Sequence, residues 1–479
     1  MTEGSLATEN LRPRSSLSRT ALVYLAMFAA AVALFLWLAE RGRALVAPAP
    51  AEGVPRFGGD APGNVNTLLH VLLALAVILI TARAVGSVFR RLGQPPVIGE
   101  VIAGILLGPS LLGWVSPAAY GYLLPTSVAP YLGVLAQIGV ILFMFLVGLE
   151  LDTGTLRQGT HSTIAISHAS IVVPFLLGST FALWLYPRFA TSDVPFTVFA
   201  LFLGVSMSVT AFPVLARILT DRNLQRTPLG IVALTCAAVD DVTAWCLLAF
   251  VVSVAKARIG SAAVTVLLTL AFIAVVLLLA RPLLLRLVEK VERQGRLTQT
   301  PIALVFIALL LSALATESIG IHALFGAFLL GAVIPHDSRV AKDLTRRLED
   351  LVIIFMLPAF FAFTGMRTQI GLVRGFGEWG VCATIILIAC LGKFGGSYLA
   401  ARLTHLPWRE SAALGVLMNT RGLMELIVLN IGLDLKVLSP RLFAMFVLMA
   451  VITTLMTAPI LERLIGSKIR AGGEEPAIS

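Results

Sequence analysis

The chain has 479 residues, of which 58% are hydrophobic and only 13% charged, and its mean hydropathy is +0.93. Soluble domains carry about 25% charged residues, so this composition leaves too little polar surface to cover a globule. It excludes a soluble protein, a disordered chain, a disulfide scaffold and a nucleic-acid binder. The net charge of +10 is explained by the excess of basic residues in the cytoplasmic loops of membrane proteins. The composition therefore predicts a polytopic, all-α membrane protein.

Fourteen apolar segments are candidate transmembrane helices, because a span needs roughly 20 mostly apolar residues and fewer where a helix is broken or buried. They are 20–39, 66–90, 97–113, 130–149, 162–186, 196–218, 228–254, 262–285, 301–316, 320–335, 350–366, 379–402, 411–433 and 441–464.

The first span follows a basic stretch, as the apolar part of a signal peptide does. Its apolar run is long for a signal peptide, and 47–53 is a weak cleavage signal. We therefore expect an uncleaved extra helix. Residues 1–65 then form a tail, this helix and a loop, 66–464 form the transmembrane domain, and 465–479 form a short tail.

The Lys and Arg residues of the loops predict the orientation. With the N-terminus inside, alternate loops place 22 of these residues inside and 10 outside. Because cytoplasmic loops carry the excess of Lys and Arg, we expect both termini in the cytoplasm and the protein in the cell (inner) membrane.

The helix count contains a repeat. After the first helix, thirteen spans divide into six (66–254), one linker (262–285) and six (301–464). Because a single helix separates two units of six, the second unit crosses the membrane in the opposite sense. Inverted repeats with broken helices near the midplane are typical of secondary transporters.

The fifth helix of each unit contains a predicted break. Residues 204–213 (GVSMSVTAFP) place small polar residues and Pro213 in mid-span, and proline removes a backbone hydrogen bond. The second unit has Asn419, Thr420, Arg421 and a glycine at the matching place, with Glu425 one turn further on. Two breaks at equivalent positions favour a transporter.

Three charged residues stand near the centres of spans. Asp240 and Asp241 lie in the middle of 228–254, and Lys393 lies between glycines in 379–402. A charge there costs on the order of 2.5–3.5 kcal/mol, so such residues are usually paired and functional. Adjacent helix positions point about 100° apart, so the two carboxylates serve different partners. Lys393 is expected to pair with one of them, in a bridge whose role is either functional or purely structural.

Arg421 and Glu425 have the i, i+4 spacing of a helical ion pair. We expect them to pair with each other and neutralise the second break. His168 and His322 are interpreted as packing residues, and the four cysteines as buried, inert thiols because none has C-x-x-C spacing.

The aspartates suggest a chemistry. Desolvation disfavours an ionised carboxylate and a nearby cation favours it, so one poised between these effects can hold either a proton or a monovalent cation. Backbone carbonyls of the break and the hydroxyls of Ser208 and Thr210 would add oxygen ligands. Competition of H⁺ with Na⁺ or K⁺ for one carboxylate gives coupled exchange without a cofactor.

Several motifs occur along the chain. They are 93–100 (GQPPVIGE), 104–110 (GILLGPS), 143–150 (FMFLVGLE), 323–328 (ALFGAF) and the Asp-Asp pair. Together they resemble the monovalent cation:proton antiporter-2 family. Within that family, 208–217 (SVTAFPVLAR) and 419–426 (NTRGLMEL) are similar to the plant CHX cation/proton exchangers. The resemblance covers about 66–464.

This resemblance implies a homodimer with a dimer domain and a core domain, the core helices being about 162–254 and 379–464. It implies elevator-like alternating access around two crossing broken helices. Asp241 would be the carboxylate that binds cation and proton, Asp240 the partner of Lys393, and Thr210 a residue of the first crossing. The plant group usually has Asn where this chain has Asp240, whereas Asp-Asp with an intramembrane Lys resembles electrogenic sodium/proton members. The choice between K⁺ and Na⁺ and the stoichiometry therefore stay open.

Three other functions are alternatives to an antiporter. An intramembrane aspartyl protease needs aspartates on two facing helices, whereas Asp240 and Asp241 are neighbours on one. A cation channel would use the same site without coupling. A symporter of related fold would move an organic anion with Na⁺.

Overall fold

The computed structural model describes residues 14–48, 66–150, 161–192, 194–225, 227–256, 262–294 and 298–471, and its regular elements there are helices. This confirms the all-α fold. Most of the expected N-terminal tail, the loop before residue 66 and the end of the C-terminal tail lie outside the described residues.

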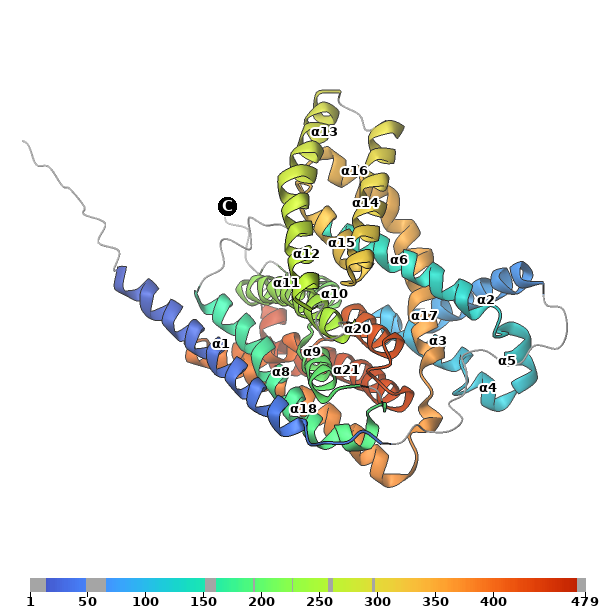
Figure 1. The fold of residues 1–479 in the computed structure, drawn as a ribbon, viewed down its shortest axis with the longest axis horizontal. Coiled ribbons are helices and arrows are strands. Elements are labelled where there is room, and N and C mark those ends of the chain that lie inside the picture. Colours follow the sequence, from blue (N-terminus) through green and yellow to red (C-terminus); the bar gives the residue numbers. More distant parts are fainter. Residues whose placement is uncertain are drawn as a thin grey trace, which may run out of the picture.

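One group of helices is built from the first three spans after the extra helix and their counterparts in the second half of the chain (Figure 1). Its members pack mainly against one another. They are α2 (Thr67–Arg91), α3 (Pro96–Leu107), α6 (Ala129–Glu150), α14 (Gln299–Ile319), α15 (Ala323–Ala332) and α17 (Leu357–Arg367). We call this the scaffold group.

A second group, which we call the core group, packs around the two helices α8 and α18. Its members are α8 (His161–Phe189), α9 (Phe196–Ser208), α10 (Phe212–Asp221), α11 (Pro228–Lys256), α18 (Gly375–Leu403), α19 (Trp408–Met418), α20 (Leu423–Asp434) and α21 (Pro440–Ala471).

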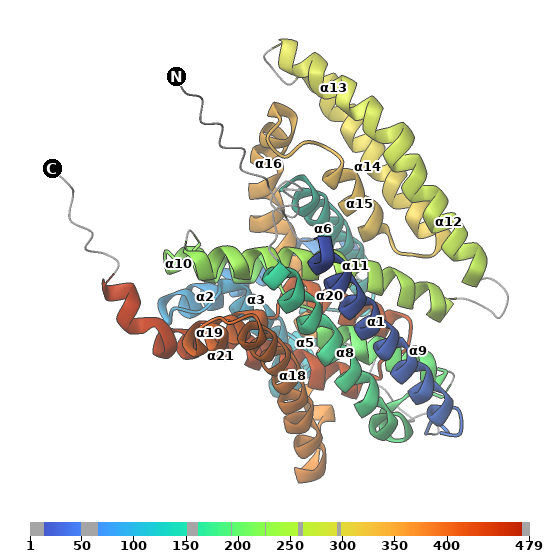
Figure 2. The same ribbon diagram turned by 90° about the vertical axis from the view of Figure 1, so that its left-hand side faces the viewer.

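The remaining helices connect or flank these groups. Helix α12 (Ala262–Val275) continues through a π-helical turn (Val276–Ala280) into α13 (Arg281–Gln294), and α16 (Arg339–Leu351) continues through another (Val352–Met356) into α17. The short helices α4 (Leu112–Val115) and α5 (Pro117–Leu123) follow α3, and a single 3₁₀ turn (Ile370–Leu372) follows α17. Helix α1 (Arg14–Gly42) lies along α8 in both views (Figures 1 and 2), with the ring of Phe28 against that of His168. The extra helix therefore belongs with the core group.

The described part of the chain has 12 helices long and apolar enough to cross a membrane, or 13 when the bent pair α19–α20 is taken as one more. The polytopic character is thereby confirmed, but the helix of one expected span, 320–335, is much shorter than predicted. Residues 320–335 form only the ten-residue helix α15. The chain leaves α14 at Gly320 and enters α15 at His322, both with positive φ, and Pro335 follows its end.

Two expected boundaries are also corrected. The span expected at 350–366 begins much earlier, since α16 carries the helix back to Arg339. Helix α16 carries many charged residues, so hydropathy alone does not predict it, but it buries one apolar side made by Val340, Leu344 and Leu348. The C-terminal tail expected from 465 is helical as far as Ala471.

Glycines let helices of the scaffold group approach closely. A Cβ atom on Gly104 of α3 would lie 2.3 Å from the carbonyl oxygen of Ala362 on α17, and one on Gly365 of α17 the same distance from that of Val101. Small residues at such contacts are how membrane helices pack without a hydrophobic driving force. These glycines lie in or opposite the 104–110 motif, which therefore has a packing explanation.

Candidate functional site

The centre of the core group is a crossing of two broken helices. Helix α9 ends at Ser208 and α10 begins at Phe212, while α19 ends at Met418 and α20 begins at Leu423. The extended segments between them meet where the N–H of Ala211 donates to the carbonyl of Thr420 at 2.9 Å. Pro213 is the second residue of α10, where its missing N–H costs little. Four half-helix ends therefore converge on one point.

Arg421 neutralises one of these ends. Its guanidinium donates to the carbonyls of Ser206 and Met207 at 2.7 and 2.8 Å, in the last turn of α9. The carbonyl end of a helix carries partial negative charge, which a cation stabilises. The same guanidinium pairs with Glu425 at 2.8 Å, and both side chains are fully buried. The break is thus held by an internal ion pair and adds no net charge to the crossing.

Asp240 is the most heavily bonded carboxylate in the described part of the chain. Ser167 donates to its Oδ1 at 2.7 Å, and Ser170 and Thr210 donate to Oδ2 at 2.6 and 2.8 Å. Lys393 donates to Oδ2 at 3.0 Å. The side chain is 0% exposed. Burial of this charge is therefore compensated by a cation and three hydroxyls.

Lys393 is on α18 and Asp240 is on α11. Both of these helices pack against α8, and α18 lies especially close to it. A Cβ on Gly392 would lie 2.9 Å from Pro174 Cα, and one on Gly396 would lie 2.9 Å from the carbonyl oxygen of Ala169. The flanking glycines therefore serve the close approach that the sequence suggests. The ammonium also donates to the hydroxyl of Thr210 at 2.5 Å, which joins α18, the first break and α11.

Asp241 has a different environment, although it is the next residue of α11. It is 4% exposed, and its Oδ1 is buried without a hydrogen-bond partner. The backbone N–H of Phe212, in the first turn of α10, is directed at this carboxylate, and the charges of Asp240 and Lys393 act on it. A helix N-terminus is a favourable place for an anion. The carboxylate therefore has a free acceptor oxygen beside the positive end of a helix dipole.

The charges of the site do not cancel. When all are ionised, Asp240 and Asp241 contribute two negative charges and Lys393 contributes one positive charge, which leaves one formal negative charge in the membrane interior. A proton or one monovalent cation at Asp241 removes it. Such a site can exchange the two ligands.

The other predicted residues lie at or near the crossing. Ser208 donates back to the carbonyl of Val205 at 2.9 Å, so its hydroxyl is not bonded to either aspartate. The Asn419 amide donates to Cys390 Sγ at 3.4 Å, and its Oδ1 is buried without a partner. The Thr420 hydroxyl lies 3.4 Å from that of Thr457.

Sequence reasoning missed Ser167 and Ser170. They stand at i, i+3 in the first third of α8, and both are fully buried. This spacing puts two hydroxyls on one side of a helix, and that pattern was the available signal. The sequence alone does not reveal that α8 packs against α11.

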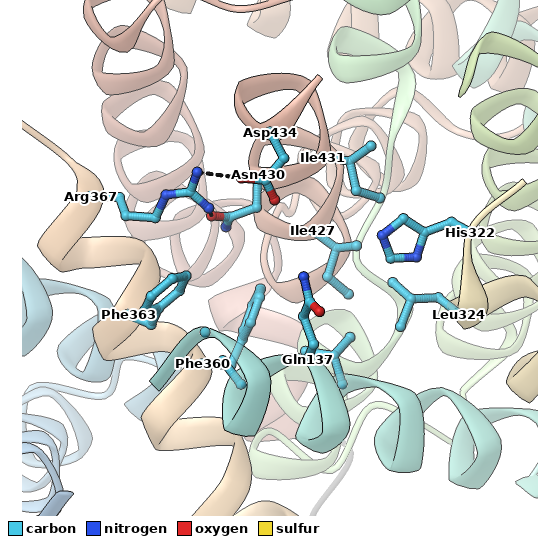
Figure 3. A pocket seen from close by; sticks show the side chains of 13 residues that line it. Gln137, His322, Leu324, Phe360, Phe363, Arg367, Ile427, Asn430, Ile431 and Asp434 are labelled. Atoms are coloured by element: carbon cyan, nitrogen blue, oxygen red, sulfur yellow. Dashed lines mark hydrogen bonds and ion pairs between the residues drawn. The ribbon is translucent and has the colours of Figure 1, made fainter. Parts of the chain in front are cut away.

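A second polar cluster bridges the two helix groups. Arg367 of α17 donates to Asn430 Oδ1 at 3.0 Å and to Asp434 Oδ1 at 2.5 Å, both on α20. The Asn430 amide donates back to Thr364 of α17 at 2.8 Å. Figure 3 shows Arg367, Asn430 and Asp434 at the edge of a pocket between α6, α15, α17 and α20, with Gln137 on another wall. Neither aspartate of the crossing lines this pocket, so it is separate from the site around Asp240.

Comparison with known proteins gives a family match over most of the chain. Residues 73–463 match the family described as sodium/hydrogen exchanger, transmembrane. The Na(+)/H(+) antiporter NhaS4 of Synechocystis sp. is 45% identical over 403 residues, which cover 84% of this chain and 98% of that protein.

Two eukaryotic relatives are longer. Cation/H(+) antiporter 19 of Arabidopsis thaliana is 39% identical and K(+)/H(+) antiporter 1 of Saccharomyces cerevisiae is 35% identical, over 86% and 87% of this chain. The alignments cover 52% and 49% of these proteins, so the chain spans about half their length.

A solved structure shows a similar fold. The sodium proton antiporter MjNhaP1 from Methanocaldococcus jannaschii superposes with a TM-score of 0.61 at 15% identity, over 84% of this chain and 98% of that one. At this identity the likeness concerns the fold alone.

Proposed function

The chain belongs to the sodium/hydrogen exchanger family and is a monovalent cation/proton antiporter, and we propose that Asp241 is the carboxylate at which cation and proton compete. One observation carries this assignment. Of the two adjacent aspartates, Asp240 has four donors, whereas Asp241 keeps a buried oxygen without a partner. Asp241 can therefore take up a ligand at this oxygen without breaking an existing bond.

Coupling follows from the cost of moving a charge. The empty site carries one formal negative charge, and charged groups in the membrane interior are costly. A site loaded with a cation or a proton is neutral and reorients more easily. The proposed cycle therefore moves a cation one way and a proton the other, and the empty site does not return.

Alternating access would be a movement of the core group against the scaffold group. The crossing, both aspartates and Lys393 all lie in the core group, so a rigid shift of that group would carry the site as a unit. We propose that 66–464 is the transport domain, with 162–254 and 379–464 as its moving part. The N-terminal helix would move with them because it packs on α8 and α9.

The proposal also covers the membrane in which the protein lies, its orientation there and its oligomeric state. The Lys and Arg count favours cytoplasmic termini in the cell (inner) membrane, and the family resemblance favours a homodimer. The names of the relatives include both Na⁺ and K⁺, so either ion is a candidate.

The test uses purified protein in vesicles that hold a pH gradient and a pH-sensitive dye. Addition of Na⁺ or K⁺ is expected to collapse the gradient for the wild type but not for Asp241→Asn, because an amide cannot exchange a proton for a cation. Asp337→Asn, at an exposed acid outside the membrane spans, is the matched control and should behave as the wild type. Robust exchange by Asp241→Asn would overturn the assignment.

The same vesicles separate the alternative functions. A channel would pass the cation without moving protons. An organic-anion symporter would leave the dye unchanged with either cation until its anion is supplied.

A further inference from the structure

An aromatic contact joins the core group to the scaffold group beside the ion site. The indole ring of Trp245 on α11 stacks on the phenyl ring of Phe328 on α15, with ring centroids 6.5 Å apart and an interplanar angle of 24°. Both side chains are buried. Trp245 stands four residues after Asp241, so the two side chains lie on the same side of α11. The stack is therefore one helical turn from the carboxylate to which we assign the cation.

The same stack is one helical turn from the pocket of Figure 3. Leu324 of α15 lines that pocket, and Phe328 follows it at i+4 on the same side of the helix. The pocket also has a polar wall in the membrane interior, because Gln137 of α6 lines it. A route along one turn of α15 and one turn of α11 thus leads from the pocket to Asp241, and the Trp245–Phe328 stack lies on it.

This route is closed by apolar packing. Leu324, Phe328 and Trp245 belong to one buried apolar cluster, and neither aspartate of the crossing lines the pocket. A constriction made of apolar side chains stops ions because it excludes the water that would hydrate them. The stack therefore separates Asp241 from the polar pocket.

The scaffold side of the stack is fixed in position. A Cβ atom on Gly326 of α15 would lie 2.3 Å from the carbonyl oxygen of Ser312 on α14, and one on Gly148 of α6 would lie 2.3 Å from the carbonyl oxygen of Phe328 itself. Helix α15 is thus held between two neighbours with no space to shift. The 143–150 and 323–328 motifs contain these glycines, and their packing explains how Phe328 is held. Separation of the two rings must come from movement of α11.

The Trp245 side of the stack has an unsatisfied polar atom. Its indole N–H is buried without a hydrogen-bond partner, as is Oδ1 of Asp241 one turn away. Buried tryptophans usually bond through this N–H, and a buried donor without an acceptor is costly. Water that enters as the rings separate can bond with both atoms. Ring packing therefore favours the closed arrangement and the unsatisfied N–H opposes it, which allows the contact to open.

Building on the proposed exchange at Asp241, we propose that Trp245 and Phe328 are positioning residues that form a gate between the pocket and this carboxylate. A hydrated cation or a proton from the pocket reaches Asp241 when movement of α11 separates the two rings. Alternating access requires that a site open to one side of the membrane is closed to the other. Without the gate, Asp241 stays open on the pocket side in both conformations, and protons cross the membrane without a cation.

The experiment measures proton leakage in the absence of Na⁺ and K⁺. Vesicles with the purified protein hold a pH gradient in choline thiocyanate, whose permeant anion compensates the charge of moving protons, and the dye follows the decay. The wild type should hold the gradient, whereas Phe328→Ala should lose it several times faster. Phe328→Leu, which keeps a large apolar side chain, should restore most of the seal. Phe181→Ala is the matched control, because Phe181 stacks on Trp184 within α8, and it should hold the gradient as the wild type does.

A second substitution tests whether the leak passes through the site. Phe328→Ala with Asp241→Asn should not leak, because the amide cannot take up a proton. A merely structural role of Phe328 lowers the amount of folded protein but does not produce a leak that depends on Asp241. If Phe328→Ala does not fold, Trp245→Leu removes the other ring of the stack and should leak in the same way.

The outcomes are distinct. A Phe328→Ala variant that exchanges cations and holds the gradient as the wild type does overturns the gate and leaves the antiport function intact. A leak that persists with Asp241→Asn bypasses the site and also overturns the gate. Absence of exchange by the wild type with both cations overturns the proposed function itself and the inference with it.

Discussion

The backbone N–H of Ala211 and the carbonyl of Thr420 form the hydrogen bond that joins the two broken helices, at 2.9 Å. The two residues are far apart in the sequence and belong to the two halves of the chain. Their bond is made between extended segments, where neither backbone group has a partner within its own helix. The crossing is therefore one structural unit, and its stability depends on how the surrounding polar groups satisfy the four half-helix ends.

The first prediction concerns Arg421, which is the main stabiliser of that unit. Arg421→Met leaves the carbonyls of Ser206 and Met207 and the carboxylate of Glu425 without their donor in a fully buried place. Removal of one partner of a buried pair costs about 3–5 kcal/mol. We expect a strongly lowered melting temperature of the detergent-solubilised protein.

Two further variants test whether the loss of stability comes from the lost contacts of the Arg421 guanidinium. Arg421→Lys should recover little, because an ammonium cannot reproduce the fork that reaches two carbonyls and a carboxylate. Arg421→Met with Glu425→Leu should recover part of the loss, because no unpaired charge remains. A melting temperature of Arg421→Met equal to that of the wild type would contradict this role.

The second prediction concerns the Lys393–Asp240 pair. Lys393→Met leaves Asp240 fully buried with three hydroxyls but no cation, and about 3–5 kcal/mol of stability should be lost. Asp240→Asn with Lys393→Met should regain much of it, because a neutral amide still bonds with the surrounding hydroxyls. Thermal unfolding of the single and double variants measures the coupling between the two positions.

Lys342→Met, at an exposed site on α16, is the control for loss of a positive charge. It should melt as the wild type does. Equal stability of Lys393→Met and the wild type would show that the ion pair contributes nothing to the fold.

The sequence predicts the charged centre of this protein better than its hydroxyl ligands. A charge in an apolar span is visible because it violates the pattern, so Asp240, Asp241, Lys393 and Arg421 could all be found. A serine violates nothing, since hydroxyls are ordinary in membrane helices. Ser208 was expected near the ion because it stands at the break, but its hydroxyl turns back to Val205.

The helix boundaries show the same limit. The sequence does not reveal helix α16 because charged residues cover its exposed side. Hydropathy does not detect a polar helix that continues a membrane span. The segment 320–335 looks apolar enough to cross the membrane, but two backbone conformations with positive φ, at Gly320 and His322, shorten its helix. Such conformations at a non-glycine residue are not apparent from composition.

The third prediction follows from competition at Asp241. A proton and a cation cannot occupy the carboxylate together, so protons act as a competitive inhibitor of the cation. Raising the pH should lower the cation concentration that gives half-maximal exchange, by up to about tenfold per pH unit while Asp241 is mostly protonated. The effect should level off at higher pH. The maximal rate at saturating cation should change far less.

Dye-based exchange at a series of cation concentrations and pH values tests this. In the Asp337→Asn variant, the cation concentration that gives half-maximal exchange should change with pH as it does in the wild type. A half-maximal concentration that is independent of pH, with only the maximal rate changing, would mean that the two ions bind at different groups.

The fourth prediction concerns Arg367, which connects the scaffold group to the core group. Its bonds to Asn430 and Asp434 must break if α20 moves relative to α17 during transport. The Asp434 side chain is 49% exposed, and an ion pair with one exposed partner contributes about 0–1 kcal/mol. Arg367→Gln should therefore leave the melting temperature within a few degrees of the wild type but change the exchange rate.

A charge-reversed pair distinguishes the bridge from other effects of the arginine. Arg367→Asp with Asp434→Arg should move the exchange rate back toward that of the wild type, whereas Arg367→Asp alone should not, because it places two carboxylates side by side. Initial rates in vesicles, normalised to the amount of folded protein, measure this. If neither single variant alters the rate, α17 and α20 keep their contact throughout the cycle, and the movement of the core group must take place elsewhere along its boundary with the scaffold group.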